Sequence, residues 1–260
     1  MNLKMFQVDA FTNQLFGGNP AAVIPLKNWL PDETLLKIAI ENNLSETAFF
    51  IEHENHFDLR WFTPAYEVDL CGHATLATAH VLWTELGYTK DKIVFKSKSG
   101  QLGVRKVDGF YEMDFPTDQI TKADLPSEIA EALACDIIET WKGRDDFLVL
   151  LKSKAALTAL APDFRTLGKL KTRGVIATAQ GQDVDFVSRC FYPYYGIDED
   201  PVTGSAHTTL APFWSEKLGK NKMTARQISR RGGFLKLHLQ AERTAIQGQA
   251  VTFLSGVIEI

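Results

Sequence analysis

Short apolar runs with the alternation of β-strands follow one another along the chain, and a few longer segments carry apolar residues at helical spacing. A first helix is predicted to begin near Pro31 and to end at Asn42-Asn43, with Asn43 as a left-handed cap. A second begins at Gly72 and continues through Ala74–Leu86, where nearly every face is apolar. A helix that is hydrophobic all round is buried. Strands are predicted at residues 4–11, 21–25, 45–51, 58–62, 93–96, 102–107 and 110–115.

The second half of the chain repeats this pattern after about 130 residues, which indicates an internal duplication. Arg60-Trp61-Phe62-Thr63-Pro64 is matched by Arg189-Cys190-Phe191-Tyr192-Pro193. Each copy precedes an acidic loop, a Gly-polar-Ala helix start and a helix that ends near a tryptophan, Trp83 or Trp214.

These patterns predict an α+β fold of two pseudo-symmetric, β-barrel-like domains, each wrapped around a central apolar helix. A polar segment at residues 117–126 is the expected linker, which gives domains at 1–117 and 118–260. Closing strands are predicted at 234–239, 245–254 and 256–260, and the last strand is allowed to pack back on the first domain.

Composition narrows the possible partners. The 260 residues are 45% hydrophobic and 23% charged, as in soluble globular proteins, and the net charge of −4 argues against nucleic acid as a partner. The basic residues between Lys217 and Arg231 are interpreted as solvated surface. Three widely spaced cysteines suit a reducing, cytoplasmic setting. No signal peptide or membrane-spanning run is present.

The densest chemistry lies at Glu199–His207, where an acid pair and a rigid turn precede a helix opened by Gly204. Pro201 keeps Asp200 extended and its carboxylate free for a cleft. Ser205 falls in the first turn of the helix, where its hydroxyl and N–H can bind an anion such as a carboxylate. An ordinary acidic turn followed by a helix cap is the alternative.

The stretch Glu67–Thr75 echoes this arrangement, with His73 one residue after its glycine. If the two halves form one site, His73 and Ser205 face each other across a pseudo-twofold cleft. Cys71 is either a thiolate activated by the helix N-terminus or, as the pattern favours, an inert buried thiol.

Glu46 stands at a helix-to-strand junction, directly before a nearly continuous apolar run. Burial against apolar walls raises the pKa of a carboxyl group and makes it a useful general acid and base. A surface glutamate at a strand start is the alternative. No metal site is expected, because His80 and His207 lie on buried helices without ligands at suitable spacing. No nucleotide-binding or serine-hydrolase motif is present, so no cofactor is expected.

Four motifs, spread over almost the whole chain, are recognisable as a set: Gly18-Asn19-Pro20-Ala21-Ala22-Val23, Leu44-Ser45-Glu46-Thr47-Ala48-Phe49, Cys71-Gly72-His73-Ala74-Thr75 and Asp200-Pro201-Val202-Thr203-Gly204-Ser205-Ala206-His207. Together they resemble the motif set of the PhzF family, the phenazine-biosynthesis isomerases and their relatives. The resemblance implies the diaminopimelate-epimerase-like fold, with the active site between two barrels, and a homodimer.

In the phenazine enzyme a single glutamate shifts a proton on dihydro-hydroxyanthranilate without a cofactor, and by motif position that glutamate corresponds to Glu46. The resemblance implies that Asp200 and His73 lie beside the substrate, Ser205 near its carboxylate and Asn19 along the pocket.

The related epimerases and proline racemases use two cysteines, one in each glycine-containing motif. Here the first position is Cys71 and the second is Thr203. A threonine hydroxyl is far too weakly acidic to replace a thiol. We therefore predict a one-carboxylate isomerase acting on a small carboxylated metabolite. An epimerase or racemase that uses Cys71 with another base, and a non-catalytic metabolite-binding protein, remain alternatives, and the sequence does not identify the substrate.

Overall fold

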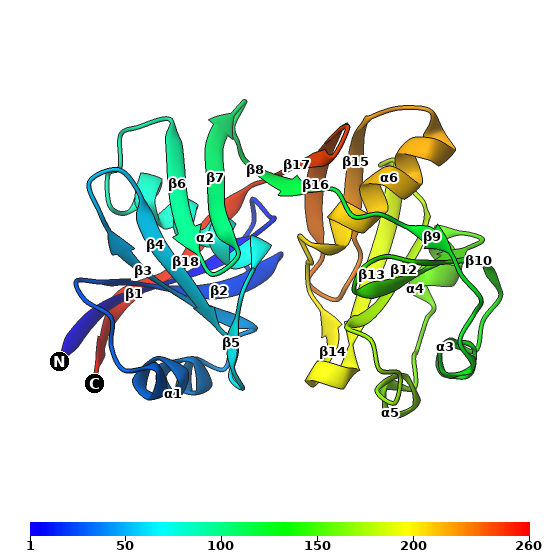
Figure 1. Cartoon of the computed structure of the whole chain (residues 1–260), viewed down its shortest axis with the longest axis horizontal. Helices are drawn as coiled ribbons and strands as arrows, with labels where there is room; N and C mark the ends of the chain where they lie inside the picture. The colour runs from blue at the N-terminus through cyan, green and yellow to red at the C-terminus, as the bar shows by residue number, and fades with distance from the viewer. The chain divides into compact units, whose positions relative to one another are not determined.

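The structure of the protein, a computed structural model, describes all 260 residues. Its internal contacts divide the chain into two compact units (Figure 1). Unit 1 is Met1–Asp114 with Gln247–Ile260, and unit 2 is Phe115–Ile246. The sequence-based division at residue 117 lies close to this boundary, but the last strand belongs to unit 1. Both units combine a mixed sheet with helices, which confirms the α+β class.

Unit 1 is built on a mixed sheet in which β1 pairs with the C-terminal strand β18 on one side and with β2 on the other, both antiparallel. The sheet continues from β2 to β3 in parallel, from β3 to β4 antiparallel, from β4 to β6 in parallel, and then through two antiparallel pairs to β7 and β8. The strands are β1 (Asn2–Ala10), β2 (Asn19–Leu26), β3 (Glu46–Glu52), β4 (Phe57–Phe62), β5 (Glu67–Val68), β6 (Lys92–Ser97), β7 (Gly100–Val107), β8 (Phe110–Pro116) and β18 (Ala250–Glu259).

Two helices provide the crossovers between the parallel strands of unit 1. Helix α1 (Asp32–Asn42) joins β2 to β3, and Asn43 ends it in the left-handed conformation as predicted. Helix α2 (Gly72–Thr84) joins β4 to β6, and every residue from His73 to Trp83 is buried. It packs on β1, β2, β3 and β18. The burial predicted from its all-round apolar character is therefore confirmed.

Unit 2 repeats this connectivity. An antiparallel pair, β10–β11, leads to the parallel pair β11–β12, the antiparallel pair β12–β13, the parallel pair β13–β15 and the antiparallel pair β15–β16. Strand β9 flanks β10 as β18 flanks β1. The strands are β9 (Thr121–Lys122), β10 (Ile137–Lys142), β11 (Asp146–Leu151), β12 (Gly174–Gln180), β13 (Phe186–Tyr192), β14 (Ile197–Asp200), β15 (Lys222–Gln227), β16 (Gly233–Gln240) and β17 (Arg243–Gly248).

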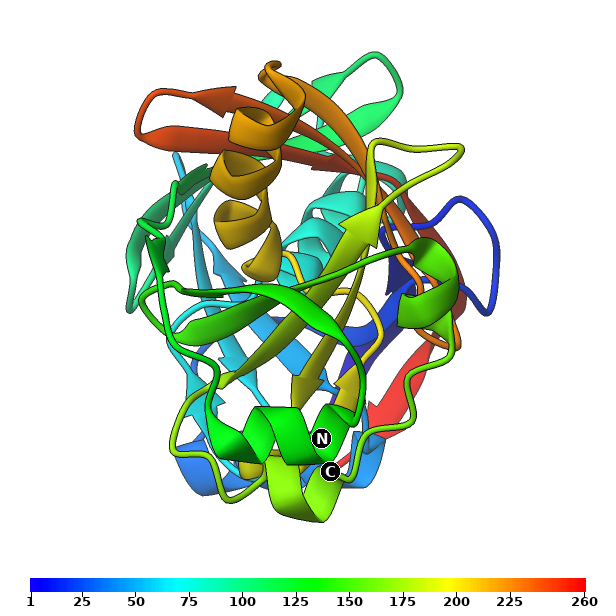
Figure 2. The same cartoon turned by 90° about the vertical axis from the view of Figure 1, so that its right-hand side faces the viewer.

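The helices of unit 2 differ more from those of unit 1. Figure 2, which faces unit 2, shows the long helix α6 (Ala206–Leu218, gold) and, at the lower edge, the short helices α3 (Ser127–Leu133) and α5 (Phe164–Leu167). Helix α6 packs on β11, β15 and β16 and is the counterpart of α2. Where unit 1 has α1, unit 2 has the short helices α4 (Lys154–Thr158) and α5.

An ion pair is conserved between the two units at the same place in the sheet. In unit 1 the guanidinium of Arg60 on β4 donates two hydrogen bonds of 2.7 Å to Glu67 on β5. In unit 2 the guanidinium of Arg189 on β13 donates two hydrogen bonds, of 2.7 and 2.9 Å, to Glu199 on β14. Bidentate pairs of this kind fix geometry as well as charge. The matched contacts support the predicted duplication.

Two sequence-based expectations about segments are wrong. The segment 117–126 is part of unit 2 rather than a linker, because the Thr117 N–H donates to the carbonyl of Glu242 and β9 pairs with β10. In place of the expected strands 245–254 and 256–260, the structure has β17 and β18, and the break between these two strands lies at Gln249. Gly256, where a new strand was expected to begin, lies within β18 and pairs with Met5 of β1. None of the helices combines the length and apolar character needed to cross a membrane.

We predict that Gly18→Ala destabilises unit 1 strongly. Gly18 has φ of +62°, and a Cβ built there would lie 2.1 Å from the carbonyl oxygen of Ala10. The left-handed conformation alone costs an L-residue about 1–2 kcal/mol, and the clash with backbone adds to it. Gly87→Ala is the matched control, since Gly87 has φ of +71° but no atom near its added Cβ. Urea unfolding should show a larger loss of unfolding free energy at Gly18; equal losses would contradict this steric argument.

Candidate functional site

Three of the predicted site residues come together in unit 1. Glu46 is the first residue of β3, Asn19 the first of β2, and His73 lies in the first turn of α2. Parallel pairing places Ala21 of β2 opposite Glu46, so the starts of these two strands are adjacent. The Nδ2 atom of Asn19 lies 3.3 Å from Nδ1 of His73, and Oε2 of Glu46 lies 3.1 Å from the other ring nitrogen, Nε2. The imidazole is held between the amide and the carboxylate.

The contact between Glu46 and His73 leaves hydrogen-bonding capacity unused. Both side chains are largely buried, with 14% and 6% of their surfaces exposed. Although Oε2 and Nε2 are close, they are not aligned for a hydrogen bond, and neither has another hydrogen-bond partner. Buried polar atoms without partners are costly in a folded protein and call for an explanation. A bound substrate that reaches both atoms is one such explanation.

The neighbours of His73 determine its charge. Burial disfavours the imidazolium, but the adjacent Cys71 and Glu46 favour it, and the balance raises the pKa of His73 well above its ordinary value. We attribute the rise to Glu46, because Cys71 is a neutral thiol at neutral pH. Burial, followed by the negative charge of Glu46, raises the pKa of the Cys71 thiol to about 11. This supports the interpretation of Cys71 as an inert thiol.

Glu46, Cys71 and His73 each offer a ligand atom within 4.8 Å of the others, a set that could hold a metal ion. The high pKa of the Cys71 thiol disfavours this, because the thiolate is the form that binds metal. The absence of a catalytic metal therefore stays a prediction.

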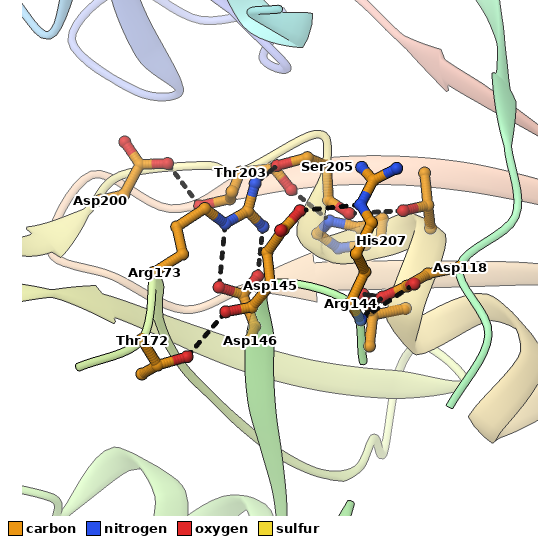
Figure 3. A network of polar contacts seen from close by, with 12 residues as sticks. Asp118, Arg144, Asp145, Asp146, Thr172, Arg173, Asp200, Thr203, Ser205 and His207 are labelled. Carbon is orange, nitrogen blue, oxygen red and sulfur yellow. Dashed lines mark hydrogen bonds and ion pairs between the residues drawn. The ribbon is translucent and has the colours of Figure 1, made fainter. Parts of the chain in front are cut away.

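Unit 2 holds the remaining predicted residues on one segment (Figure 3). Asp200 ends β14, and Gly204 and Ser205 lead into α6. Asp200 is buried and accepts a short hydrogen bond from the hydroxyl of Thr203. Ser205 is the N-cap residue, but its side chain accepts no hydrogen bond from the helix backbone. The N–H groups in the first turn of a helix attract anions, so this segment can receive a carboxylate.

Sequence reasoning missed Arg173, which contacts Ser205. Its Nη1 donates to Oγ of Ser205 at 3.0 Å, and its Nε donates to Oδ1 of Asp146 at 2.9 Å, with a second, shorter contact from Nη2 to Oδ2 (Figure 3). Asp146 is fully buried, which holds the guanidinium in place. Because Oγ of Ser205 accepts from Arg173, the hydroxyl proton is directed elsewhere and can be donated to a ligand. The available signal was a charged residue at the start of each of two parallel strands, since Asp146 opens β11 and Arg173 directly precedes β12.

Gln227, at the end of β15, was also missed. Its side chain is completely buried and binds the segment that carries Asp200. The Nε2 atom donates to the carbonyl oxygen of Asp200 at 2.7 Å and to Oγ1 of Thr203 at 3.3 Å, while Oε1 accepts from the N–H of Thr203 at 2.9 Å. The signal was a glutamine on the inward-facing side of β15, in register with the apolar Met223 and Ala225.

The two remaining buried histidines serve the fold. Burial lowers the pKa of both His80 and His207 to about 4, so both are neutral. His207 bonds through Nδ1 to the carbonyl oxygen of Thr203 at 2.8 Å. His80 bonds to the hydroxyls of Tyr111 and Thr252, each at 3.0 Å.

Known proteins resemble this chain in sequence and in fold. The family described as phenazine biosynthesis-like protein (PhzC-PhzF) matches residues 8–256. A protein of Pseudomonas aeruginosa named as an uncharacterized isomerase is 48% identical over 260 residues, which is 100% of both chains. A crystal structure of a PhzF-family phenazine biosynthesis protein from Enterococcus faecalis covers 100% of both chains with a TM-score of 0.96 and 44% identity.

A more distant likeness concerns the fold alone. The structure of a hydroxyproline epimerase from Agrobacterium vitis, with bound trans-4-hydroxy-L-proline, has a TM-score of 0.63 and 10% identity, and the match covers 99% of this chain and 92% of that one. The family match, by contrast, rests on near-complete coverage at high identity. The chain therefore belongs to the phenazine biosynthesis-like family and is an enzyme of the isomerase type.

Proposed function

We propose that this protein is a cofactor-independent isomerase that moves a proton on a small carboxylated metabolite, with Glu46 as the general acid and base. The observation that carries the proposal is the buried contact of Glu46 with His73, in which Oε2 and Nε2 lie 3.1 Å apart and neither has a hydrogen-bond partner. A carboxylate so placed can take a proton from one carbon and return it to another. Asn19 and His73 hold the substrate beside it.

The charge of His73 suits this role. In the resting enzyme a positively charged His73 imidazole lies 3.1 Å from the Glu46 carboxylate that accepts the proton. As Glu46 becomes protonated, the positive charge of His73 is left without its partner. It can then stabilise the negative charge that develops on the substrate. Return of the proton to a different carbon restores the starting pair, so the cycle needs no external acid, base or cofactor.

Unit 2 supplies the groups for the substrate's carboxylate. The backbone N–H groups that follow Gly204 and the hydroxyl of Ser205 bind the anion, and Arg173 orients that hydroxyl by donating to Oγ at 3.0 Å. Asp200 binds a polar group of the same substrate molecule. Dihydro-hydroxyanthranilate, the substrate of the phenazine enzyme, serves as a reference compound rather than as the predicted substrate, and the natural substrate is a carboxylated, amino-bearing or cyclic metabolite.

Two other functions remain as outcomes of the tests. A two-base epimerase or racemase would need a second base opposite Cys71, but Thr203 stands at that position and its hydroxyl already donates to Asp200. A binding protein without turnover would keep the pocket and bind the same anions.

The finer features of the fold and assembly expected from the sequence stay proposals. We propose that each sheet closes around its apolar helix as a barrel and that the two units are domains. We also propose a homodimer, supported by the exposed apolar side chains of Phe253, Leu254 and Val257 on β18. The cytoplasmic location stays a prediction.

We expect Glu46→Gln to reduce turnover by about 10²–10⁴-fold, the usual contribution of a general acid or base. The amide keeps the shape of the side chain but cannot carry the proton. The enzyme is incubated in D₂O with dihydro-hydroxyanthranilate, and separately with a metabolite extract. Chromatography follows conversion into an isomer, and mass spectrometry detects the deuterium gained where the proton on Glu46 exchanges with solvent before it is returned. Glu52→Gln is the control, since Glu52 is exposed at the other end of β3. Full activity in folded Glu46→Gln would refute the proposal, and anion binding without turnover in the wild type would indicate a binding protein.

Cys71→Ala should leave turnover within a few-fold of the wild type, since a thiol whose pKa is raised to about 11 is protonated at neutral pH and a poor base. In a matched experiment, iodoacetamide should alkylate Cys71 only slowly at pH 7.5 and faster as the pH approaches 11. Loss of deuterium exchange at a substrate stereocentre in Cys71→Ala would instead favour the epimerase.

Gln227→Met should lower the free energy of unfolding by about 2–4 kcal/mol, because it leaves the buried Thr203 N–H without its acceptor and the Asp200 carbonyl without its donor. Activity should fall as well, since the segment that carries Asp200 loosens. Gln240→Met, at an exposed position, should change stability by no more than about 0.5 kcal/mol. Similar small effects in both variants would show that Gln227 does not hold this segment.

A further inference from the structure

A histidine pair lies at the tip of the β3–β4 hairpin, at the end of β3 opposite to Glu46. The N–H of His53 donates to the carbonyl oxygen of His56 at 2.9 Å, which closes the turn. The turn brings the two imidazoles together, with ring centroids 4.6 Å apart and planes inclined by 11°. Neither residue has a part in the proposed proton transfer.

Both rings point their Nε2 atoms at one carboxylate. Asp58 follows His56 by two residues on β4, which places the two side chains on the same face of the strand. The Nε2 of His53 lies 2.9 Å from Oδ2 of Asp58, and the Nε2 of His56 lies 3.3 Å from Oδ1. The three side chains converge on one point, the two imidazoles from the turn and Asp58 from β4.

We propose that His53, His56 and Asp58 form a binding site for a divalent transition-metal ion of the zinc class. Two imidazoles and a carboxylate are a common ligand set for Zn²⁺, with the remaining coordination position open to water. Each residue offers one ligand atom, and these atoms lie within 4.8 Å of one another.

The distances suit a single ion. Tetrahedral Zn²⁺ with bonds of about 2.0–2.1 Å holds its ligand atoms about 3.3–3.4 Å apart. The two histidine-to-carboxylate distances, 2.9 and 3.3 Å, are already in this region. The two imidazole nitrogens would have to approach one another by at most about 1.5 Å, which rotation of the partly exposed side chains can supply.

The local charge also favours a cation. Glu52 and Glu54 are exposed on the same hairpin and add to the negative charge of Asp58. Lys96 is the register partner of Asp58 across the β4–β6 pair and is the opposing charge. The acidic residues Glu52, Glu54 and Asp58 outnumber this lysine.

Zn²⁺ titration of the full-length protein against a chromophoric zinc indicator tests the site. The wild type should bind one equivalent of Zn²⁺ at the hairpin. His53→Ala, His56→Ala and Asp58→Asn should each weaken the affinity for Zn²⁺ by about tenfold or more, because the loss of a group that only supports a metal ligand already has an effect of that size. His238→Ala is the matched control for a histidine outside the cluster, and Cys71→Ser tests the other potential metal cluster. Both should bind Zn²⁺ as the wild type does.

Thermal unfolding gives a second readout. Zn²⁺ should raise the melting temperature of the wild type and of His238→Ala, but not of His53→Ala, because only a ligand that binds the folded hairpin stabilises it. The proposal is overturned if no Zn²⁺ binds, if binding survives in all three hairpin variants, or if it is lost in Cys71→Ser or His238→Ala. Loss of binding in Cys71→Ser would instead assign the ion to the cluster of Glu46, Cys71 and His73, whereas the other outcomes leave the role of Glu46 untouched.

Discussion

Burial of the two long helices is the constraint on which the structure depends. Helix α2 presents no polar face to solvent from His73 to Trp83, so it is stable only where strands cover it on several sides. The strands that cover it include β2 and β3, and these strands begin with Asn19 and Glu46. Packing of these strands on the apolar helix thereby brings Asn19 and Glu46 beside His73 in the first turn of α2.

The duplication explains how one scaffold provides two kinds of chemistry. In unit 1 the acidic residue at the start of β3 contacts the histidine after Gly72. In unit 2 a basic residue, Arg173, precedes β12 and contacts the serine after Gly204. The two contacts occupy corresponding places in the same connectivity but carry opposite charge. Unit 1 thus has a carboxylate at this place and unit 2 a guanidinium.

The features predicted correctly from the sequence are those that local pattern determines. A periodic or repeated pattern in the sequence indicates the apolar helix after Gly72, the Asn43 cap and the repeated Arg60 and Arg189 segments. Arg173, Asp146 and Gln227 leave little trace of this kind, because their importance arises from partners about 25 to 30 residues away that only the folded sheet brings near. The segment 117–126 is polar yet ordered, since its backbone bonds satisfy groups of unit 2 rather than solvent. Composition alone does not distinguish an ordered polar segment from a solvated linker.

The pairing of β18 with β1 affects how the chain can fold during synthesis. Strand β1 forms a ladder with the last strand that extends from Asn2 opposite Glu259 to Ala10 opposite Ala250. Unit 1 therefore lacks one of its strands until β18 has left the ribosome, whereas unit 2 is contained in one continuous stretch, Phe115–Ile246. Domains generally fold in the order in which they emerge, but here the later unit is complete first. The N-terminal segments, including the one that carries Glu46, reach their final packing only after β18 has emerged.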